Sequence, residues 1–454
     1  MKKLVLATLI FSLVLSVPAL AATDGTMSLK DSVVAAVKQH PQIKSLLYNR
    51  DAVSKAQLSA LGRFFPSLDL AGELGWQQYS NANNRANRTD DDTRTPTDVS
   101  ATLTQNVFDG FDRWNDYQRE DARMTSAEGR LVDNVETVAL DAIRAHVDVV
   151  RNRRLVALAG ENITAHQELL DSISERVEGG AGNRADEMQA KGRVARAETT
   201  LVNYVGELRT AEAEYTRTVG ATPEALGDPE YNPEYIPGTV EQILETTLDN
   251  NPKIHVYKAE IEVAERTKNQ LMSTMYPNVD VYAQIRQRDD YDGVDSWVND
   301  KKVMLSASWN VFNGGSDFND VRTAAARIRE AKSNLQDTTD DLIRQVASAW
   351  AEYESSIGQI EKYQEALQYS LESLDMYLMQ FNVGQRSLLD VLDATNEVFS
   401  NKVQLETATS NRNFTLYKFL ALEGELMKTL EVASNTYEEI PEEAEMEPAA
   451  AEAQ

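Results

Sequence analysis

Residues 28–43 read SLKDSVVAAVKQHPQI, and residues 239–254 read TVEQILETTLDNNPKI. The apolar positions and the late proline of the two stretches match at a shift of 211 residues (239 − 28). Further along, QNVFDG at 105–110 matches WNVFNG at 309–314, at a shift of 204 (309 − 105) that persists behind these blocks. A helical heptad pattern alone can make two unrelated stretches of sequence look alike. It does not generate matched prolines or matched Val-Phe-Asx-Gly turns. The sequence therefore predicts a duplicated structural unit.

Each unit contains a long stretch without proline. None occurs between Pro96 and Pro223, nor between Pro277 and Pro441. These stretches are rich in Ala, Leu, Glu, Gln and Arg, which predicts helix. Apolar residues recur there every three or four positions, as in the coiled-coil seam Ile343, Val346, Trp350, Tyr353, Ile357 and Ile360. A helix over residues 315–380 would be roughly 100 Å long at about 1.5 Å per residue, which is too long for an ordinary globular domain.

Four shorter segments alternate apolar and polar residues with period two, at about 66–78, 98–109, 277–288 and 301–313. This is the pattern of a strand with one apolar face. Segments of about ten residues fit a tilted membrane strand. A soluble amphipathic hairpin alternates in the same way, so the pattern alone leaves that alternative open.

One chain supplies four such strands, which cannot close a barrel. An open strand edge in lipid leaves backbone groups unpaired, so membrane strands require several copies of the chain. Eight strands from a dimer give a barrel filled by side chains, whereas twelve strands from a trimer enclose a lumen. The predicted fold class is an α+β membrane protein with a duplicated unit of long coiled-coil helices plus two β-strands. Three copies are expected to form a trimeric 12-stranded β-barrel continued by an α-helical periplasmic barrel.

The expected domains are a signal peptide (1–21), a first structural repeat (22–222), an inter-repeat equatorial linker (223–238), a second structural repeat (239–430) and an acidic disordered tail (431–454). The signal peptide is indicated by Lys2 and Lys3, an apolar run and an Ala-Leu-Ala cleavage site. Four prolines mark the linker. Disorder of the tail is expected because its end is rich in glutamate and alanine.

The composition excludes several classes of function. The chain has no cysteine, which excludes disulfides, thiolate metal sites and cysteine nucleophiles. Its net charge of -27 argues against nucleic acid as a partner, because phosphate binding needs a basic face. The histidines lack metal-ligand spacing, and no nucleotide-binding or nucleophile motif occurs. We therefore expect no enzyme activity, no cofactor and no structural metal.

The whole mature chain resembles the TolC family of trimeric outer-membrane efflux and secretion ducts. The resemblance rests on the paired openings His40-Pro41 and Asn251-Pro252, on the Val-Phe-Asx-Gly strand exits, and above all on residues 381–394, FNVGQRSLLDVLDA. It implies a homotrimer surrounded by the outer-membrane lipid of a Gram-negative bacterium, with a periplasmic helical extension. It also implies a periplasmic adaptor (membrane fusion protein) and an inner-membrane ABC or other transporter as partners.

The resemblance further assigns a gate at the periplasmic tip of the helices. Asp390 and Asp393 match the positions that form the narrowest ring of the family's tunnel. Arg386, Phe381 and Asp186 match the network that restrains this gate, and Phe381 stands where a tyrosine is expected. These five residues are therefore the candidate site.

The spacing of the two aspartates agrees with a ring, because Asp390 and Asp393 lie one helical turn apart on one face. Three copies would place six carboxylates around one constriction, which attracts cations and predicts cation block there. Gly180 and Gly384 fall where the long helices should turn back, so we predict that they form the helix-tip turns. The sequence alone leaves open that both aspartates are ordinary first-turn acids favoured by the helix dipole.

The leading hypothesis for function is the outer-membrane component of a tripartite export system. It would give a type I secreted protein, such as an adhesin or toxin, passage from periplasm to exterior. This cargo is suggested by residues 176–198, RVEGGAGNRADEMQAKGRVARAE, which resemble the tips of family members paired with type I systems. One alternative is a multidrug or small-molecule efflux duct of the same family. An alternative of another class is a periplasmic coiled-coil scaffold without a pore.

Overall fold

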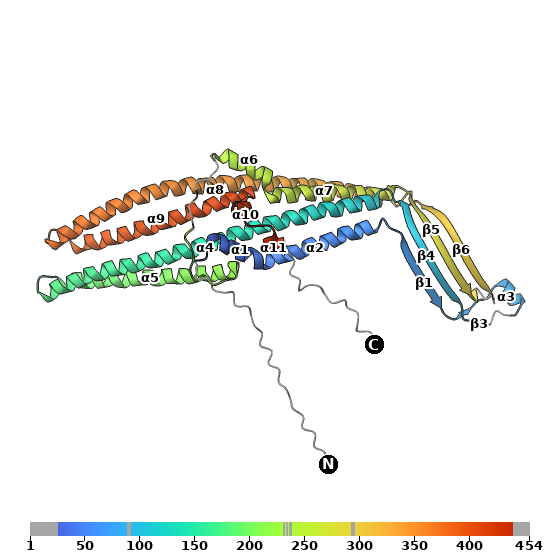
Figure 1. Cartoon of the computed structure of the whole chain (residues 1–454), viewed down its shortest axis with the longest axis horizontal. Helices are drawn as coiled ribbons and strands as arrows, with labels where there is room; N and C mark the ends of the chain where they lie inside the picture. The colour runs from blue at the N-terminus through green and yellow to red at the C-terminus, as the bar shows by residue number, and fades with distance from the viewer. Residues whose placement is uncertain are drawn as a thin grey trace, which may run out of the picture.

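The computed structural model describes residues 26–88, 92–229, 232, 235, 238–291 and 296–438. The signal peptide expected at 1–21 lies outside these residues, as does the acidic tail from residue 439 onward. Figure 1 shows an elongated helical bundle with a small sheet at one end and two helical hairpins reaching the other end. This division agrees with the helical and strand regions predicted from the sequence.

The two repeats contain the same main elements in the same order. The first has α1 (Leu29–Gln39), α2 (Pro41–Gly62), β1 (Ser67–Leu74), β4 (Thr97–Phe108), α4 (Asp112–Glu178) and α5 (Arg184–Val219). The second has α6 (Val240–Asn250), α7 (Pro252–Met272), β5 (Asn278–Asp289), β6 (Trp297–Ser308), α8 (Ser316–Asn382) and α9 (Leu388–Glu423). Helices α4 and α8 each have 67 residues, and α5 and α9 each have 36. The predicted duplication is therefore confirmed in three dimensions.

The smaller elements lie around the turns and the middle of the bundle. They are β2 (Gln77–Gln78), α3 (Ala82–Ala86), β3 (Thr93–Arg94), η2 (Ser273–Met275), α10 (Leu426–Thr429) and α11 (Asn435–Glu438). The tail predicted to be disordered from residue 431 begins with an ordered part. Val432 is 9% exposed, and Tyr437 packs against the core around α1. The sequence prediction placed the boundary too early because these apolar residues precede the glutamate-rich end.

The motif that opens each repeat is a helix N-cap. Ser28 and Asp31 form a reciprocal capping box at α1, and Thr239 and Gln242 form the same box at α6. In both repeats a proline then occupies the first turn of the next helix, where its missing N–H group costs no hydrogen bond. The repeated stretches quoted from the sequence therefore encode the same helix–break–helix unit.

The strands form one antiparallel sheet in the order β1-β4-β5-β6, so β1 and β6 are its edges. The strand predicted at 301–313 is displaced, because β6 spans Trp297–Ser308. Its pairing ends at Asn278↔Ser308, directly after Pro277, so the alternating residues beyond Ser308 have no partner strand in this sheet. The strand predicted at 66–78 is also two strands, since β1 ends at Leu74 and β2 pairs separately with β3.

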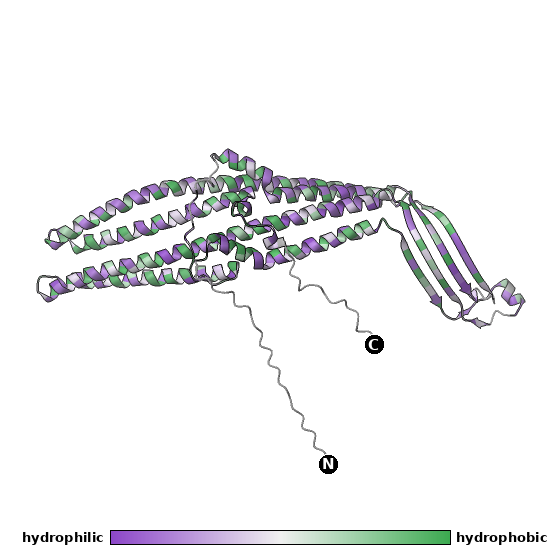
Figure 2. Cartoon of the chain, viewed as in Figure 1, coloured by the Kyte–Doolittle hydropathy of each residue, from purple (hydrophilic) through white to green (hydrophobic). Residues whose placement is uncertain are grey.

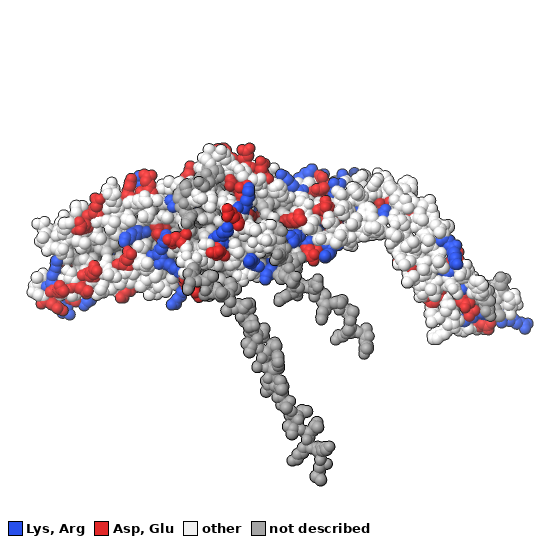
Figure 3. All heavy atoms as spheres, in the orientation of Figure 1, with Lys and Arg blue, Asp and Glu red and all other residues white. Residues whose placement is uncertain are grey.

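The sheet has one apolar and one polar face. One row of paired residues crosses all four strands with apolar side chains: Leu68, Leu103, Ala283 and Val303. The next row is polar: Asp69, Thr102, Gln284 and Lys302. Figure 2 shows this alternation along the strands, and Figure 3 shows few charged side chains over the middle of the visible face. Val303 is 73% exposed, so no other part of the described chain covers the apolar face there.

Among the described residues, no helix combines the length and the hydropathy needed for a membrane span.

A buried polar cluster fastens the linker to the waist of the bundle. The Oγ atom of Ser32 lies 2.9 Å from Nδ1 of His146, and Nε2 of His146 lies 2.8 Å from the carbonyl oxygen of Gly227. Because a carbonyl only accepts, Nε2 carries the proton and donates to it. Burial lowers the pKa of His146, which keeps the ring neutral. The cluster joins α1, α4 and the start of the inter-repeat segment at the middle of the molecule.

Candidate functional site

Two glycine turns end the helical hairpins. Gly180 between α4 and α5 has a φ of +73°, and Gly384 between α8 and α9 has a φ of +76°. Residues with a Cβ rarely adopt this left-handed conformation. In the second turn the N–H of Gln385 donates to the carbonyl of Gln380 at 2.9 Å, and the first turn has the equivalent bond. Both turns therefore have the hydrogen bonding of a Schellman motif.

The two candidate gate aspartates lie at the start of α9. Ser387 caps this helix, because its Oγ accepts a hydrogen bond from the backbone N of Asp390 at 3.3 Å. Asp390 and Asp393 have side chains that are 42% and 57% exposed. A helix N-terminus stabilises negative charge, which explains acids here without any gate. Whether the two aspartates can act as a gate therefore depends on the groups that face their carboxylates.

Asp390 is paired with the arginine that precedes it. Nε of Arg386 lies 3.0 Å from Oδ2 of Asp390, although the N–H is not aligned for a hydrogen bond. The Arg386 guanidinium also lies 3.9 Å from the ring centre of Tyr377 on α8, a cation–π distance. Arg386 is thus held between its own hairpin's two helices.

Asp393 is paired with the other hairpin. Nη2 of Arg193 on α5 donates to Oδ1 of Asp393 at 2.6 Å. The arginine side chain is 23% exposed. This ion pair joins α5 of the first repeat to α9 of the second, so one of the candidate gate carboxylates holds the two repeats together at the tip.

The proposed restraining network has different partners from those expected. Phe381 contacts Arg176 of α4, whose guanidinium lies 4.6 Å from the ring centre, and Nη2 of Arg176 donates to Oδ1 of Asn382 at 2.8 Å. Asp186 lies in the first turn of α5, and its backbone N donates to the carbonyl of Asn183. In the described chain, no ion pair or hydrogen bond joins Arg386 to Phe381 or to Asp186.

An apolar cluster lies behind these charged groups. Its buried members come from α4, α5 and the start of α9: Leu170, Ile173, Ala190, Val194, Leu388 and Leu392. Phe381 packs against the cluster from the end of α8. The cluster packs the helices together, and the charged groups lie around it at the tip.

The sequence analysis did not identify Arg176, Arg193 or Tyr377. A signal for Arg193 exists, because the counterpart of Asp393 at the repeat shift is Gln189 (393 − 204), and Arg193 lies one helical turn after it. Matched turns of the two hairpins lie side by side, so a basic residue at this level of α5 was a candidate partner. Tyr377 lies across the glycine turn from Arg386, where spacing in the sequence predicts no contact.

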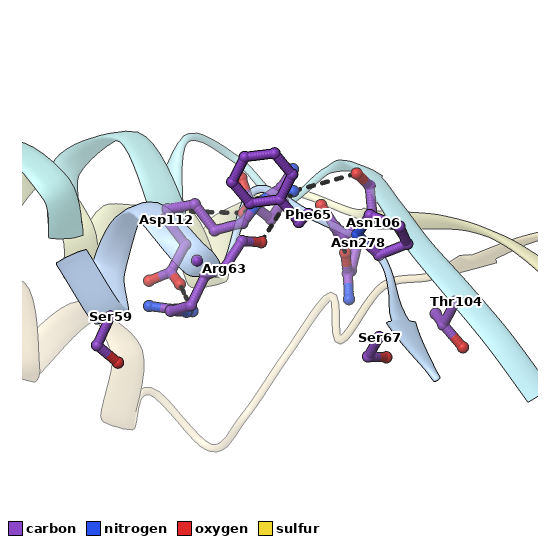
Figure 4. Close-up of a pocket in the computed structure, with 12 residues that line it drawn as sticks. Ser59, Arg63, Phe65, Ser67, Thr104, Asn106, Asp112 and Asn278 are labelled. Atoms are coloured by element: carbon purple, nitrogen blue, oxygen red, sulfur yellow. Dashed lines mark hydrogen bonds and ion pairs between the residues drawn. The ribbon is translucent and has the colours of Figure 1, made fainter. Parts of the chain in front are cut away.

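A second polar site lies where the helices meet the sheet. A cavity of about 500 Å³ is lined by Arg63, Asp112 and Asn106, among others. Figure 4 shows these three side chains. Arg63, at the end of α2, donates to Asp112 at 2.5 Å and to Asp116 at 2.5 Å, both on α4. The arginine therefore ties the helix that enters the sheet to the helix that leaves it, and the cavity is a structural feature of this bend.

Two buried carboxylates lie at the waist. Glu136 of α4 is 5% exposed, and its Oε1 accepts from the backbone N of Met427 at 3.3 Å, while Oε2 has no partner in the described chain. Burial raises the pKa of Glu136 to about 7. Glu423, at the end of α9, is 7% exposed, and burial raises its pKa to about 7 as well. In the described ranges no three His, Asp or Glu side chains are close enough to hold a metal ion.

The sequence matches the family described as outer membrane efflux protein over residues 33–221 and 243–421, one match in each repeat. The chain belongs to this family. It is therefore an outer-membrane efflux channel protein with a periplasmic helical part, and a transport conduit rather than an enzyme. This excludes the alternative of a coiled-coil scaffold without a pore. Membership also agrees with the TolC resemblance of the sequence.

Individual outer-membrane proteins are also similar to this chain in sequence or in structure. The outer membrane efflux protein BepC of Brucella suis biovar 1 (strain 1330) is 25% identical over 337 residues, covering 74% of each chain. The outer membrane protein TolC of Escherichia coli (strain K12) is 23% identical over 395 residues, covering 82% of this chain and 77% of TolC. Among solved structures, CusC superposes with a TM-score of 0.77 at 16% identity, over 87% of this chain and 91% of CusC. VceC from Vibrio cholerae gives 0.75 at 16%, over 88% and 95%.

Proposed function

We propose that three copies of this chain form a channel-tunnel that conducts cargo from the periplasm to the exterior. The observation that supports this most strongly is the sheet, which has two unpaired edges and two chemically different faces. An edge strand presents unpaired N–H and C=O groups, which lipid cannot satisfy. Pairing β6 of one copy with β1 of the next satisfies them, and three copies give the twelve strands that enclose a lumen.

The faces of the sheet fit this arrangement. The row that contains Leu68 and Val303 is apolar across all four strands, and those two side chains are 65% and 73% exposed. An outward apolar band of this kind is what lipid requires of a membrane barrel. The opposite row, from Asp69 to Lys302, would line an aqueous lumen.

Asp390 and Asp393 form the gate in this proposal, and Gly180 and Gly384 form the turns at the tunnel's entrance. The two carboxylates lie at the end of the bundle farthest from the sheet, on the first turns of α9. Three copies around an axis would place them at one constriction. Rings of carboxylates favour cations and impede anions, so this end would determine which ions pass.

For the cargo, we infer a polypeptide delivered by a type I exporter. The inference rests on the tip of the first hairpin, residues 176–198, whose sequence resembles members that serve such systems. A small-molecule cargo is the second candidate, because the relative BepC is named an efflux protein. In both cases the chain would work with a periplasmic adaptor and an inner-membrane transporter, which supply the energy.

Replacing both Asp390 and Asp393 by alanine is expected to weaken block of the channel by divalent cations. Single-channel current of the purified protein in planar bilayers, titrated with Mg²⁺, measures the effect. The blocking concentration should rise about tenfold or more, since one unit charge acting on a divalent ion at roughly 6 Å in water corresponds to about tenfold. Block at an unchanged concentration would place the constriction elsewhere.

The partners and the cargo are tested by crosslinking in intact cells followed by purification of the chain. An ATP-driven exporter captured with an adaptor supports the polypeptide cargo. A proton-driven pump captured in its place supports efflux of small molecules. Recovery of the chain as a soluble monomer after cell breakage would contradict both cargo assignments and the channel itself.

A further inference from the structure

A small cavity lies at the waist of the bundle, where α9 ends and α7 begins. Figure 1 shows the end of α9 beside the start of α7 at the middle of the molecule. The side chain of Asn251, which precedes α7, donates to the carbonyl of Leu422 on α9 at 2.8 Å. Both residues line the cavity, whose volume is about 220 Å³ and whose other walls come from α4 and α8. The cavity therefore lies at a junction of four helices.

The lining of this cavity combines apolar walls with carboxylates. Its apolar side chains come from α4, α8 and α9: Leu140, Leu342, Ala421 and Leu422. Its three acidic side chains all come from α4: Asp133, Glu136 and Asp141. At about 100° per residue, the spacing of the three acids places them on one side of that helix. The cavity thus offers hydrocarbon contact and negative charge to the same occupant.

The carboxylate of Glu136 is only partly satisfied by the fold. The residue is 5% exposed, and its Oε1 accepts from the backbone N of Met427 at 3.3 Å. Its Oε2 has no hydrogen-bond partner in the described chain. A buried carboxylate oxygen without a donor costs stability, and the cost is largest when the group is ionised. A cation in the cavity would offset that cost.

The two lysines that line the cavity are engaged with other acids. Nζ of Lys418 on α9 donates to Oε2 of Glu352 on α8 at 2.8 Å. Nζ of Lys253 on α7 lies 4.0 Å from Oδ1 of Asp133. In the described chain, no ion pair joins either lysine to Glu136. The positive charges that the fold itself supplies are therefore directed elsewhere.

The remaining neighbours of Glu136 are acidic or uncharged. Burial raises its pKa to about 7, and the negative charges of Asp133 and Glu425 raise this pKa further. From α8, Leu342 and Gln345 line the cavity, and neither carries a charge. Strongly perturbed carboxylates that line a cavity are typical of functional sites. Negative charge therefore predominates around the unpartnered oxygen.

We propose that this cavity binds a small primary alkylammonium cation. The ammonium group donates to Oε2 of Glu136 and pairs with Asp141, while the alkyl group lies against the leucines. An ammonium has three donors and no acceptor, so it suits ionised carboxylates, which only accept. A metal ion fits less well, because in the described ranges no three His, Asp or Glu side chains are close enough to hold one. The site does not depend on the proposed channel function.

The volume of the cavity limits the size of the ligand. A cavity of about 220 Å³ corresponds to the liquid volume of about seven water molecules. The ligand should therefore have roughly five to eight non-hydrogen atoms. The n-pentylammonium ion falls in this range and serves as the probe.

The first test is isothermal titration calorimetry of the purified full-length protein in detergent micelles, with protein-free micelles as the blank. An alkylammonium keeps its proton at pH 5.5 and at pH 8, as lysine does. Glu136, with a pKa of about 7, is mostly ionised at pH 8 and mostly protonated at pH 5.5. We therefore expect n-pentylammonium to bind at pH 8 and to bind about thirtyfold more weakly at pH 5.5.

Two further compounds separate charge from fit. The neutral 1-pentanol has the same tail without the charge, so it should bind at least about tenfold more weakly at pH 8. Tetrapentylammonium has the same charge, but it is too bulky for the cavity and has no N–H donor, so it should not bind. Equal affinity for either compound, or no binding of n-pentylammonium at pH 8, would overturn the site.

The variant Glu136→Gln tests the residue itself. Glutamine keeps an acceptor for the N–H of Met427 but removes the charge. It should weaken n-pentylammonium binding at pH 8 about ten- to a hundredfold and abolish the pH dependence. Glu128→Gln is the matched control, since Glu128 is exposed on the same helix, and should bind like the native protein. Native affinity in Glu136→Gln contradicts the proposal.

A stability measurement provides a second readout that requires no conduction. A ligand that binds only the folded state raises the midpoint of unfolding, so n-pentylammonium should raise the urea midpoint at pH 8. The ligand and Glu136→Gln both offset the same buried charge, so their stabilising effects should not add. Fully additive effects would place the ligand elsewhere and overturn the site. Because no current is measured, failure of the channel function would leave this result unchanged.

Discussion

Between pH 5 and pH 8 the native protein is expected to lose about 2–3 kcal/mol of its free energy of unfolding through Glu136. Replacing Glu136 by glutamine is expected to remove this loss. Burial raises the pKa of Glu136 from 4.5 to about 7. The folded protein therefore binds a proton that the unfolded chain has already lost between these two values. Native stability falls as pH rises from about 4.5 to about 7 and levels off above it. Glutamine does not titrate, so this loss disappears.

The midpoint of urea unfolding at the two pH values, followed by circular dichroism of the helices, measures the change. Glutamine keeps an oxygen to accept from Met427, and its amide replaces the unpaired Oε2. Glu128→Gln is the matched control, since Glu128 is exposed on the same helix and should alter neither midpoint. Adding Glu423→Gln should remove a further part of the pH dependence, because burial also raises that pKa to about 7. An equal shift by Glu136→Gln at both pH values would contradict a buried, titrating carboxylate.

Much of the fold could be predicted because its signals are local or periodic. Matched capping boxes at Ser28 and Thr239 open both repeats, and the long helices end at glycines with positive φ. The strand bounds could not be predicted from the sequence, because alternation continues past the point where pairing stops. Trp309 extends the apolar pattern of β6, yet β5 offers no partner beyond Asn278. The length of the paired segment depends on the neighbouring strand, so the sequence of one strand does not predict it.

The contacts at the tip could be predicted only in part. Asp390 and Asp393 were identified from their motif, and the structure places both at the start of α9. Their partners depend on the relative position of two hairpins separated by some two hundred residues, so Arg193 was found only in three dimensions. Arg386 illustrates the same limit, because Tyr377 meets it across a turn whose shape depends on Gly384.

Replacing Arg286 by alanine is expected to destabilise the sheet, because the carboxylate of Asp98 then loses its hydrogen-bonded cationic partner. Nε of Arg286 on β5 donates to both carboxylate oxygens of Asp98 on β4 at 2.9 Å. The side chain of Asp98 is only 6% exposed, so without the arginine a buried charge loses its compensation. That loss costs more than the intact pair contributes. Unfolding of the protein in detergent micelles, followed by loss of the strand signal in urea, measures the difference.

The double variant Arg286→Gln with Asp98→Asn should recover most of this stability, because two amides leave no buried charge. Lys302→Ala is the control, since Lys302 pairs with Asp300 of its own strand at 3.6 Å and both side chains are about one-third or more exposed. Such a pair contributes less than about 1 kcal/mol. β4 and β5 form the one strand pair in the described sheet that joins the two repeats. If Arg286→Ala matches the control, backbone pairing alone holds the repeats together at the membrane end, and the ion pair between them is dispensable.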